Sequence, residues 1–377
     1  MSVNTPVRRR VPLLDLGALH ADIRDEMMAA IAAVVDSQKF ILGEEVRRLE
    51  AEVAAYCQAR FAIGCASGSD ALFLALLAAG IGPGDRVAVP PFTFFATAGA
   101  VSRAGATPVF VDIDAETYNI DPAPLAGALD RDPRIRAVIP VHLFGGCADL
   151  DPILSAARAH NCVVIEDGAQ SIGADYRGRR SLSLGDMGCL SFFPTKNLGA
   201  LGDGGMLTTN DEALAAKLTA LRTHGGTKKY HHPWIGINSR LDTVQAAVLL
   251  VKLRRLDAWT EGRRANAALY TTLLSGTPVS VQQPAAWQTR HIYNQFVIRC
   301  PQRDRLKEHL LENGIGTEIY YPLPLHLQPC YQDLGHKEGD FPHSEQAARE
   351  VLALPVHSAL ASGDIEYVCE MVRGFYA

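Results

Sequence analysis

The sequence predicts an α/β protein: a mostly parallel, seven-stranded sheet with helices on both faces, followed by a smaller C-terminal α+β domain. Two observations lead to this fold class. Between residues 61 and 210, short β-rich runs alternate with helix-like stretches, which is the pattern of a parallel sheet covered by helices. The chain has 377 residues, a length that suits about two domains.

Seven strands are expected in this alternating part of the chain. They are Phe61–Ala66, Arg86–Pro90, Pro108–Asp112, Arg136–His142, Cys162–Asp167, Gly188–Phe193 and Gly205–Thr209. Helix-like stretches such as Asp70–Ala79 and Asp151–His160 lie between them. Ligands of such sheets bind beyond the carboxyl ends of the strands, so residues at those ends are the first candidates for a site.

Helices are expected on either side of the sheet region. Residues 21–35 and 44–57 have amphipathic patterns, and a long helical pattern runs from Leu241 toward Tyr270. The rest of the chain mixes a strand at Gln295–Arg299 with helices near 303–313 and 344–352. We therefore expect a large domain over residues 1–255, with an N-terminal helical segment, and a small domain over residues 256–377.

Composition argues against several classes of protein. The net charge of -5 and the pI near 6.2 give no electrostatic reason to expect nucleic acid or an acidic membrane surface. No apolar stretch reaches the roughly 20 residues that span a bilayer, and the start of the chain lacks a signal-peptide core. The eight cysteines are scattered without Cys-x-x-Cys spacing, so we expect no metal and a cytoplasmic protein with reduced thiols.

A lysine and an aspartate stand at the ends of two expected strands. Lys196 follows the sixth strand in a glycine-rich loop, and Asp167 ends the fifth. A buried amine beside a buried carboxylate suits pyridoxal phosphate, with the amine as Schiff-base partner and the carboxylate facing the pyridinium nitrogen. Taken alone, Asp167 could equally cap the next turn. Gln170 follows closely and could reach the phenolic oxygen of the cofactor.

The segment Cys65-Ala-Ser-Gly-Ser-Asp-Ala-Leu72 is a candidate phosphate site. Its glycine and small residues let backbone N–H groups approach an anion at a helix N-terminus, where the helix dipole also favours negative charge. The simpler interpretation is a serine N-cap on the helix that follows. Neither a P-loop nor a Gly-x-Gly-x-x-Gly motif opens the sheet, which disfavours nucleotide and dinucleotide phosphates.

Three aromatic residues follow the second expected strand, within Pro90–Thr97. One ring could lie flat on a planar cofactor. We expect at least two of the three to belong to the core.

Two later segments carry further candidates. Asn238 and Arg240 precede the long helical pattern, where an arginine most often forms a surface ion pair. Tyr320, Tyr321 and His326 lie in a proline-stiffened segment that could equally be an ordered surface loop.

Taken together, these segments resemble the sugar aminotransferases of the DegT/DnrJ/EryC1/StrS family, which belong to the fold-type I enzymes that depend on pyridoxal phosphate. The similarity runs from about Pro12 to the C-terminus. Its marks, in the order of the family, are Ser67–Leu72, Thr93-Phe94, Glu166–Gln170, Ser191–Gly205, Asn238–Asp242 and Tyr321-Pro322 with His326.

The resemblance implies a role for each candidate residue. Lys196 would bind the cofactor and then move protons between cofactor and substrate, while Asp167 pairs with the pyridine nitrogen. Gln170 would reach the phenolic oxygen, and Phe94 would stack on the ring. The implied phosphate ligands are Gly68, Ser69, Asp70, Ser191 and, from a partner subunit, Asn238. The implied substrate contacts are Arg240, Tyr320, Tyr321 and His326, also from the partner.

The resemblance also implies a reaction and an assembly. Glutamate would donate an amino group to a nucleotide-diphospho-ketosugar in an obligate homodimer with shared sites. The loop Asn197–Asp203 is similar to the branch that aminates C3 of UDP- or dTDP-linked 3-keto hexoses for glycan or lipopolysaccharide biosynthesis; amination at C4 is the alternative. Much of the family has His-Tyr-Pro where this chain has Tyr320-Tyr321-Pro322. A regulatory protein containing pyridoxal phosphate, or a sugar dehydratase, is a further alternative, although a dehydrating relative has histidine in place of Lys196.

Overall fold

The structure is a computed structural model that describes residues 9–377. The first eight residues of the expected large domain lie outside the described residues. All seven expected strands are present: β1 Phe61–Cys65, β2 Arg86–Val89, β3 Thr107–Phe110, β4 Ile135–Val138, β5 Val163–Asp167, β8 Met187–Ser191 and β9 Gly205–Thr209.

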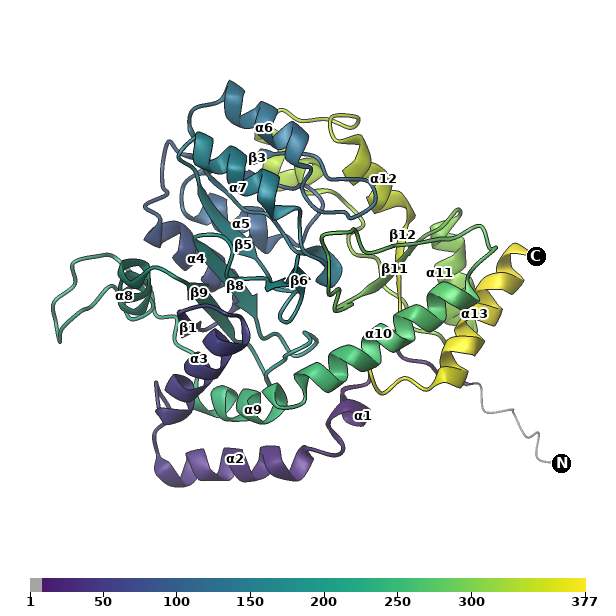
Figure 1. Ribbon diagram of the computed structural model, residues 1–377, viewed down its shortest axis with the longest axis horizontal. Coiled ribbons are helices and arrows are strands. Elements are labelled where there is room, and N and C mark those ends of the chain that lie inside the picture. The colour runs from purple at the N-terminus through teal and green to yellow at the C-terminus, as the bar shows by residue number, and fades with distance from the viewer. Residues whose placement is uncertain (1–8) are drawn as a thin grey trace.

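These strands form one twisted sheet at the centre of the large unit (Figure 1). Its order is β1-β9-β8-β5-β4-β2-β3. The pairs β2–β3, β2–β4, β4–β5 and β5–β8 are parallel, whereas β9 runs antiparallel to both of its neighbours, β1 and β8. The prediction of a mostly parallel, seven-stranded sheet is therefore confirmed.

Helices cover both faces of this sheet, and their bounds are α3 Glu44–Tyr56, α4 Gly68–Ala78, α5 Ala96–Arg103, α6 Pro122–Arg131, α7 Leu150–Ala159, α8 Glu212–Leu221 and α9 Thr243–Leu253. Neighbouring strand residues point to opposite faces. Cys189 and Leu207 accordingly pack in the core with α4, α5 and α8. Leu190 and Met206 pack on the other side with α3 and α9. The β5 strand is also buried from both sides, since Ile165 packs with α4 and α5 and Val164 packs with α7, which explains its apolar run.

The long helical pattern from Leu241 forms two helices rather than one. The first, α9, ends at Leu253, and α10 spans Leu256–Leu273. At the break, Arg254 and Arg255 turn to Glu26 of α2 (Arg24–Ser37), with N–O distances of 2.8 and 3.3 Å. The apolar spacing continues through the break, so the pattern alone did not reveal it.

The expected helices 21–35 and 44–57 are present as α2 and α3, and the short helix α1 (Leu16–His20) precedes them. Ile23 and Met27 pack against Val248 and Val251 of α9, which attaches the N-terminal helices to the large unit. No helix in the described part of the chain is long and apolar enough to cross a membrane.

The C-terminal part has its own core around a three-stranded antiparallel sheet, ordered β10-β11-β12. Its elements are β10 Ser280–Val281, β11 Phe296–Arg299, α11 Arg303–Glu312, α12 Pro342–Glu350, β12 Val351–Leu354 and α13 Ser362–Tyr376. The predicted helix 344–352 was placed two residues too late, since α12 starts at Pro342 and Val351 already pairs with Arg299 of β11. Val11 also packs in this core and forms a bridge to Ile315. The division at residue 255 stays a prediction.

Short elements complete the described chain. They are the hairpin β6 Asp175–Tyr176 and β7 Arg179–Arg180 and the 3-10 helices Leu143–Gly145, Leu325–Leu327 and Pro329–Leu334.

Candidate active site

Asp167 lies at the carboxyl end of β5, in the middle of the sheet. Its side chain is only 5% exposed. One carboxylate oxygen accepts a hydrogen bond from the Thr97 hydroxyl at 2.8 Å, and the other accepts one from the Ala169 N–H at 3.2 Å. Burial raises the pKa of the Asp167 carboxyl, and these hydrogen bonds and the positive charge of Lys196 oppose that rise. The carboxylate is thus held in a dry position within electrostatic reach of the lysine.

Lys196 follows β8, the strand that pairs in parallel with β5. Its backbone N–H donates to the carbonyl oxygen of Phe193 at 2.9 Å, which closes a turn after the strand. A Cβ atom on Gly199 would lie 2.3 Å from the Pro194 carbonyl oxygen, so only glycine fits where the loop folds back. Burial lowers the pKa of the Lys196 amine to about 8, and the charge of Asp167 opposes this shift. The amine is therefore suited to nucleophilic attack on a carbonyl group near neutral pH.

Gln170 is held in one orientation beside this pair. Its side-chain oxygen accepts a hydrogen bond from the Phe144 N–H at 2.6 Å, and its Nε2 donates to the Tyr321 hydroxyl at 3.1 Å. The amide nitrogen has a second N–H that can donate to a ligand. Because Tyr321 bonds to Gln170 of its own chain, the expectation that Tyr321 serves a partner's site is corrected: it lies at the site of its own chain.

The N-terminus of α4 meets the end of β8. Ser67 is the N-cap, since its hydroxyl accepts a hydrogen bond from the Asp70 N–H at 3.1 Å. The Asp70 N–H is thus used within the helix, and the N–H groups of Gly68 and Ser69 are the ones without an intrahelical acceptor. A Cβ on Gly68 would lie 2.7 Å from the Cβ of Ser191, so Ser191 stands directly at this helix end. The niche suits an anion such as a phosphate.

The aromatic residues after β2 are less buried than expected. Only Phe92 belongs to the core, whereas Phe94 is 57% exposed and Phe95 is also exposed. The prediction that at least two are core residues was therefore wrong, because the second and third lie in the turn that leads into α5. The Phe94 ring lies 6.2 Å from the Tyr321 ring, measured between centroids, and Tyr321 bonds to Gln170.

The remaining candidates form no hydrogen bond with Asp167, Lys196 or Gln170. Asn238 is exposed and forms a bridge to Thr223, and within residues 9–377 the half-buried Arg240 has no ion pair. Tyr320 packs edge-on against Tyr321. His326 is 1% exposed, with its Nε2 3.2 Å from Glu345 Oε1, so its own chain surrounds it. Its contact with substrate stays a prediction.

Sequence reasoning missed two residues at this site. Thr97 holds the Asp167 carboxylate, and the backbone N–H of His142 donates to the Asp167 carbonyl oxygen at 3.0 Å. His142 ends the expected fourth strand, and Thr97 ends the segment Pro90–Thr97 that follows the second; these positions were the available signal. Their contacts depend on the order of the strands in the sheet.

The assembled groups fit pyridoxal phosphate. The amine of Lys196 would bind its aldehyde, Asp167 would face its pyridine nitrogen, and the remaining N–H of Gln170 suits its phenolic oxygen. The α4 N-terminus and Ser191 offer donors for its phosphate.

Comparisons with known proteins agree with this site. The model of the DegT/DnrJ/EryC1/StrS aminotransferase family matches residues 21–373. The chain is 51% identical to the "Pleiotropic regulatory protein" of Geobacillus stearothermophilus, over 97% of this chain and 98% of that protein. It is 45% identical to the UDP-N-acetyl-3-dehydro-alpha-D-glucosamine 3-aminotransferase of Acidithiobacillus ferrooxidans, over 96% and 97% of the two chains.

A crystal structure of DesV from S. venezuelae has the same fold. It superposes with a TM-score of 0.94 at 44% identity and covers 97% of this chain and 98% of its own. The expected fold type of aminotransferases that depend on pyridoxal phosphate is thereby confirmed. The family match and the site lead to one conclusion: this chain belongs to the DegT/DnrJ/EryC1/StrS aminotransferase family.

Proposed function

We propose that this chain uses pyridoxal phosphate to transfer an amino group from glutamate to C3 of a nucleotide-linked 3-keto hexose. The observation that carries the proposal is the Lys196–Asp167 pair: an amine whose pKa is lowered to about 8 by burial, next to a buried carboxylate at the neighbouring strand end. Such a pair suits a cofactor with an aldehyde, which the amine can bind, and a basic ring nitrogen, which the carboxylate can face.

Each residue of the site has a separate role in the proposed reaction. The bound cofactor would supply an electron sink for the bond changes at the substrate carbon. Lys196 holds a proton or releases it at its Nζ, which its lowered pKa permits near neutral pH. Asp167 keeps a negative charge where the ring nitrogen would bind, and Thr97 orients that carboxylate. Gly68, Ser69 and Ser191 would anchor the phosphate, and Phe94 would cover the ring.

Amination at C3 is supported by two segments and by one relative. The loop Asn197–Asp203 and the segment Tyr320-Tyr321-Pro322 are similar to the C3-aminating branch. The A. ferrooxidans relative is named for amination at C3 of a UDP-linked sugar. We favour a UDP-linked 2-acetamido sugar over a dTDP-linked one, because the two tyrosines offer hydroxyl groups and an apolar face for an acetamido group. Arg240 would bind a carboxylate or the pyrophosphate.

We also infer a cytoplasmic homodimer with shared active sites. The segment before Asn238 exposes large apolar residues: Tyr230 is 84% and Ile235 is 93% exposed. Arg240 follows directly and has no ion pair within the described chain, as expected of a residue that serves a neighbouring site. The eight cysteines are unpaired, which suits a reducing compartment. We retain the division into residues 1–255 and 256–377.

Product analysis tests this function. The labile 3-keto sugar is generated in place by a partner dehydrogenase, in UDP- and dTDP-linked forms, and supplied with glutamate. NMR spectroscopy of the product should show an amine-bearing carbon at C3. An amine at C4 with none at C3 would overturn the regiochemistry and leave the amino transfer standing.

A regulatory protein is the second candidate, because the G. stearothermophilus relative carries that name. The net charge of -5 gives no electrostatic reason to expect DNA binding. Absorbance spectra of the holoprotein with and without glutamate distinguish the two. An aminotransferase converts the cofactor to its amine form, whereas a spectrum that glutamate leaves unchanged would favour a sensor or a dehydratase.

A further inference from the structure

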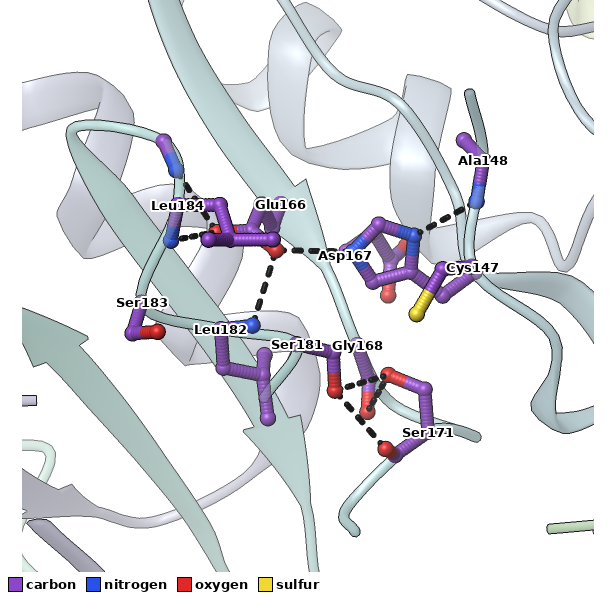
Figure 2. A network of polar contacts seen from close by, with 12 residues as sticks. Cys147, Ala148, Glu166, Asp167, Gly168, Ser171, Ser181, Leu182, Ser183 and Leu184 are labelled. Atoms are coloured by element: carbon purple, nitrogen blue, oxygen red, sulfur yellow. Dashed lines mark hydrogen bonds and ion pairs between the residues drawn. The ribbon is translucent and has the colours of Figure 1, made fainter. Parts of the chain in front are cut away.

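Glu166 precedes Asp167 on β5 and points to the opposite face of the sheet. Its carboxylate is fully buried and accepts four hydrogen bonds (Figure 2). Oε1 accepts from the N–H groups of Leu184 and Gly185 at 2.8 and 2.7 Å. Oε2 is 2.8 Å from both the Leu182 N–H nitrogen and His142 Nε2. Burial alone would raise the pKa of Glu166, but the bond to His142 and the backbone donors hold it below its usual value.

The bonds of His142 define its tautomer. Its Nδ1 accepts a hydrogen bond from the Ala148 N–H at 3.1 Å, so Nδ1 carries no proton. The ring is therefore neutral, with its proton on Nε2, and it donates to Glu166. The backbone of the same residue pairs with Asp167, whose N–H in turn donates to the Pro140 carbonyl oxygen at 2.9 Å. His142 thus holds Asp167 through its main chain and Glu166 through its side chain.

Glu166 also reaches the segment before β8. Leu182, Leu184 and Gly185 lead into the strand that ends at Ser191 and is followed by Lys196. Close packing surrounds this segment, since a Cβ on Gly188 would lie 2.8 Å from the Leu182 backbone. One carboxylate therefore links the chain after β4, the end of β5 and the approach to β8. These are the parts of the sheet that position Asp167 and Lys196.

We propose that Glu166 and His142 form a positioning unit, which sets the Asp167 carboxylate relative to the Lys196 amine and thereby tunes the cofactor site. Neither side chain bonds to the Asp167 carboxylate or to the Lys196 amine, and His142 reaches Asp167 only through its main chain. The inference rests on the proposed function for its purpose, while its geometry stands on this chain alone.

Glu166→Gln is the most direct test. The glutamine has the same shape, but its side-chain nitrogen must take the place of either Oε1 or Oε2. In both positions the NH2 group faces two hydrogen-bond donors and no acceptor, which is unfavourable. Two quantities are measured. The first is the pH midpoint of Lys196 acetylation in the cofactor-free protein, and the second is the dissociation constant for pyridoxal phosphate. We expect the midpoint to move by about one pH unit and the dissociation constant to rise about tenfold or more.

Ser181→Ala is the matched control. Ser181 is buried beside Leu182, and its hydroxyl donates to the Ser171 carbonyl oxygen at 2.8 Å, but it does not bond to Glu166 or His142. This variant should lose thermal stability and keep both the midpoint and the dissociation constant of the wild type. If Glu166→Gln gives the same result as Ser181→Ala, the pair is merely structural and the proposal is overturned.

His142 variants provide a second route if Glu166→Gln fails to fold. His142→Gln can accept from Ala148 and donate to Glu166, so it should retain the wild-type midpoint, whereas His142→Leu should shift it. Equal midpoints in the two variants would overturn the proposal. The acetylation midpoint requires neither cofactor nor sugar, so its outcome is independent of whether the proposed amino transfer is correct.

Discussion

Replacing Asp167 with asparagine should lower the pKa of the Lys196 amine further in the cofactor-free protein. In the wild type, burial lowers this pKa from 10.5 to about 8, and the negative charge of Asp167 acts in the opposite direction. Asparagine has nearly the same shape but no charge. Burial would then lower the pKa of the Lys196 amine without the opposing effect of this carboxylate. The effect follows directly from the proximity of the two side chains.

The magnitude is large enough to measure as a reaction rate. At pH 7.5, an amine with a pKa of about 8 is neutral in about a quarter of the molecules, against about one in a thousand for a pKa of 10.5. Only the neutral amine reacts with acetic anhydride. If the pKa of Lys196 falls by one further unit, about three quarters of the Lys196 side chains are neutral and reactive at the same pH.

The assay is competitive acetylation across a pH series, followed by digestion and mass spectrometry of the peptide that contains Lys196. The exposed Lys337 serves as the internal reference. Glu318→Gln is the control, because it removes a carboxylate paired with Lys307 at the surface. The wild-type midpoint should lie near 8 and that of Asp167→Asn below it. An unchanged or higher midpoint in Asp167→Asn, or a wild-type midpoint near 10.5, would refute the reasoning.

Two further predictions concern the same site, and a third concerns Lys252 of α9, whose Nζ donates a hydrogen bond to the Gly199 carbonyl oxygen at 2.7 Å. Asp167→Asn should keep the fold but lower turnover by several orders of magnitude, because a neutral pyridine is a poor electron sink; near-normal turnover would show that another group protonates the ring. Mixing inactive Lys196→Ala with an inactive Arg240→Ala variant should restore some activity through one intact composite site, and proven subunit exchange without recovery would argue against shared sites. Burial lowers the pKa of Lys252 to about 8, so the unfolded chain binds a proton at this lysine that the folded protein has lost between about pH 8 and 10.5. The free energy of unfolding of the wild type should therefore rise relative to that of Lys252→Met over this pH range. Urea unfolding at both pH values measures this, and a constant difference would contradict it.

The strands were predictable because each is a short β-rich run, and helices lie between most of them along the chain. The break between α9 and α10 was not, because Arg254 and Arg255 leave the helical path to reach Glu26, a residue more than two hundred positions earlier. The start of β12 likewise depends on pairing with β11, since Val351 alone is compatible with a helix.

The reactive residues were easier to predict than their supports. Lys196 and Asp167 stand at strand ends and carry chemistry that their residue types reveal. Thr97 and His142 owe their importance to the order of β2, β4 and β5 in the sheet, which no local pattern specifies. The resemblance implied a substrate contact for His326, whereas the structure buries it against Phe341, with its Nε2 beside Glu345.

Borohydride reduction of the holoprotein, followed by peptide mapping, tests the central claim most directly. The claim is that Lys196 binds the cofactor at the end of β8. Reduction makes the bond between lysine and cofactor permanent, so mass spectrometry can locate it. We expect the phosphopyridoxyl label on Lys196; a label on Lys217 or Lys252 would show that the cofactor binds to another lysine.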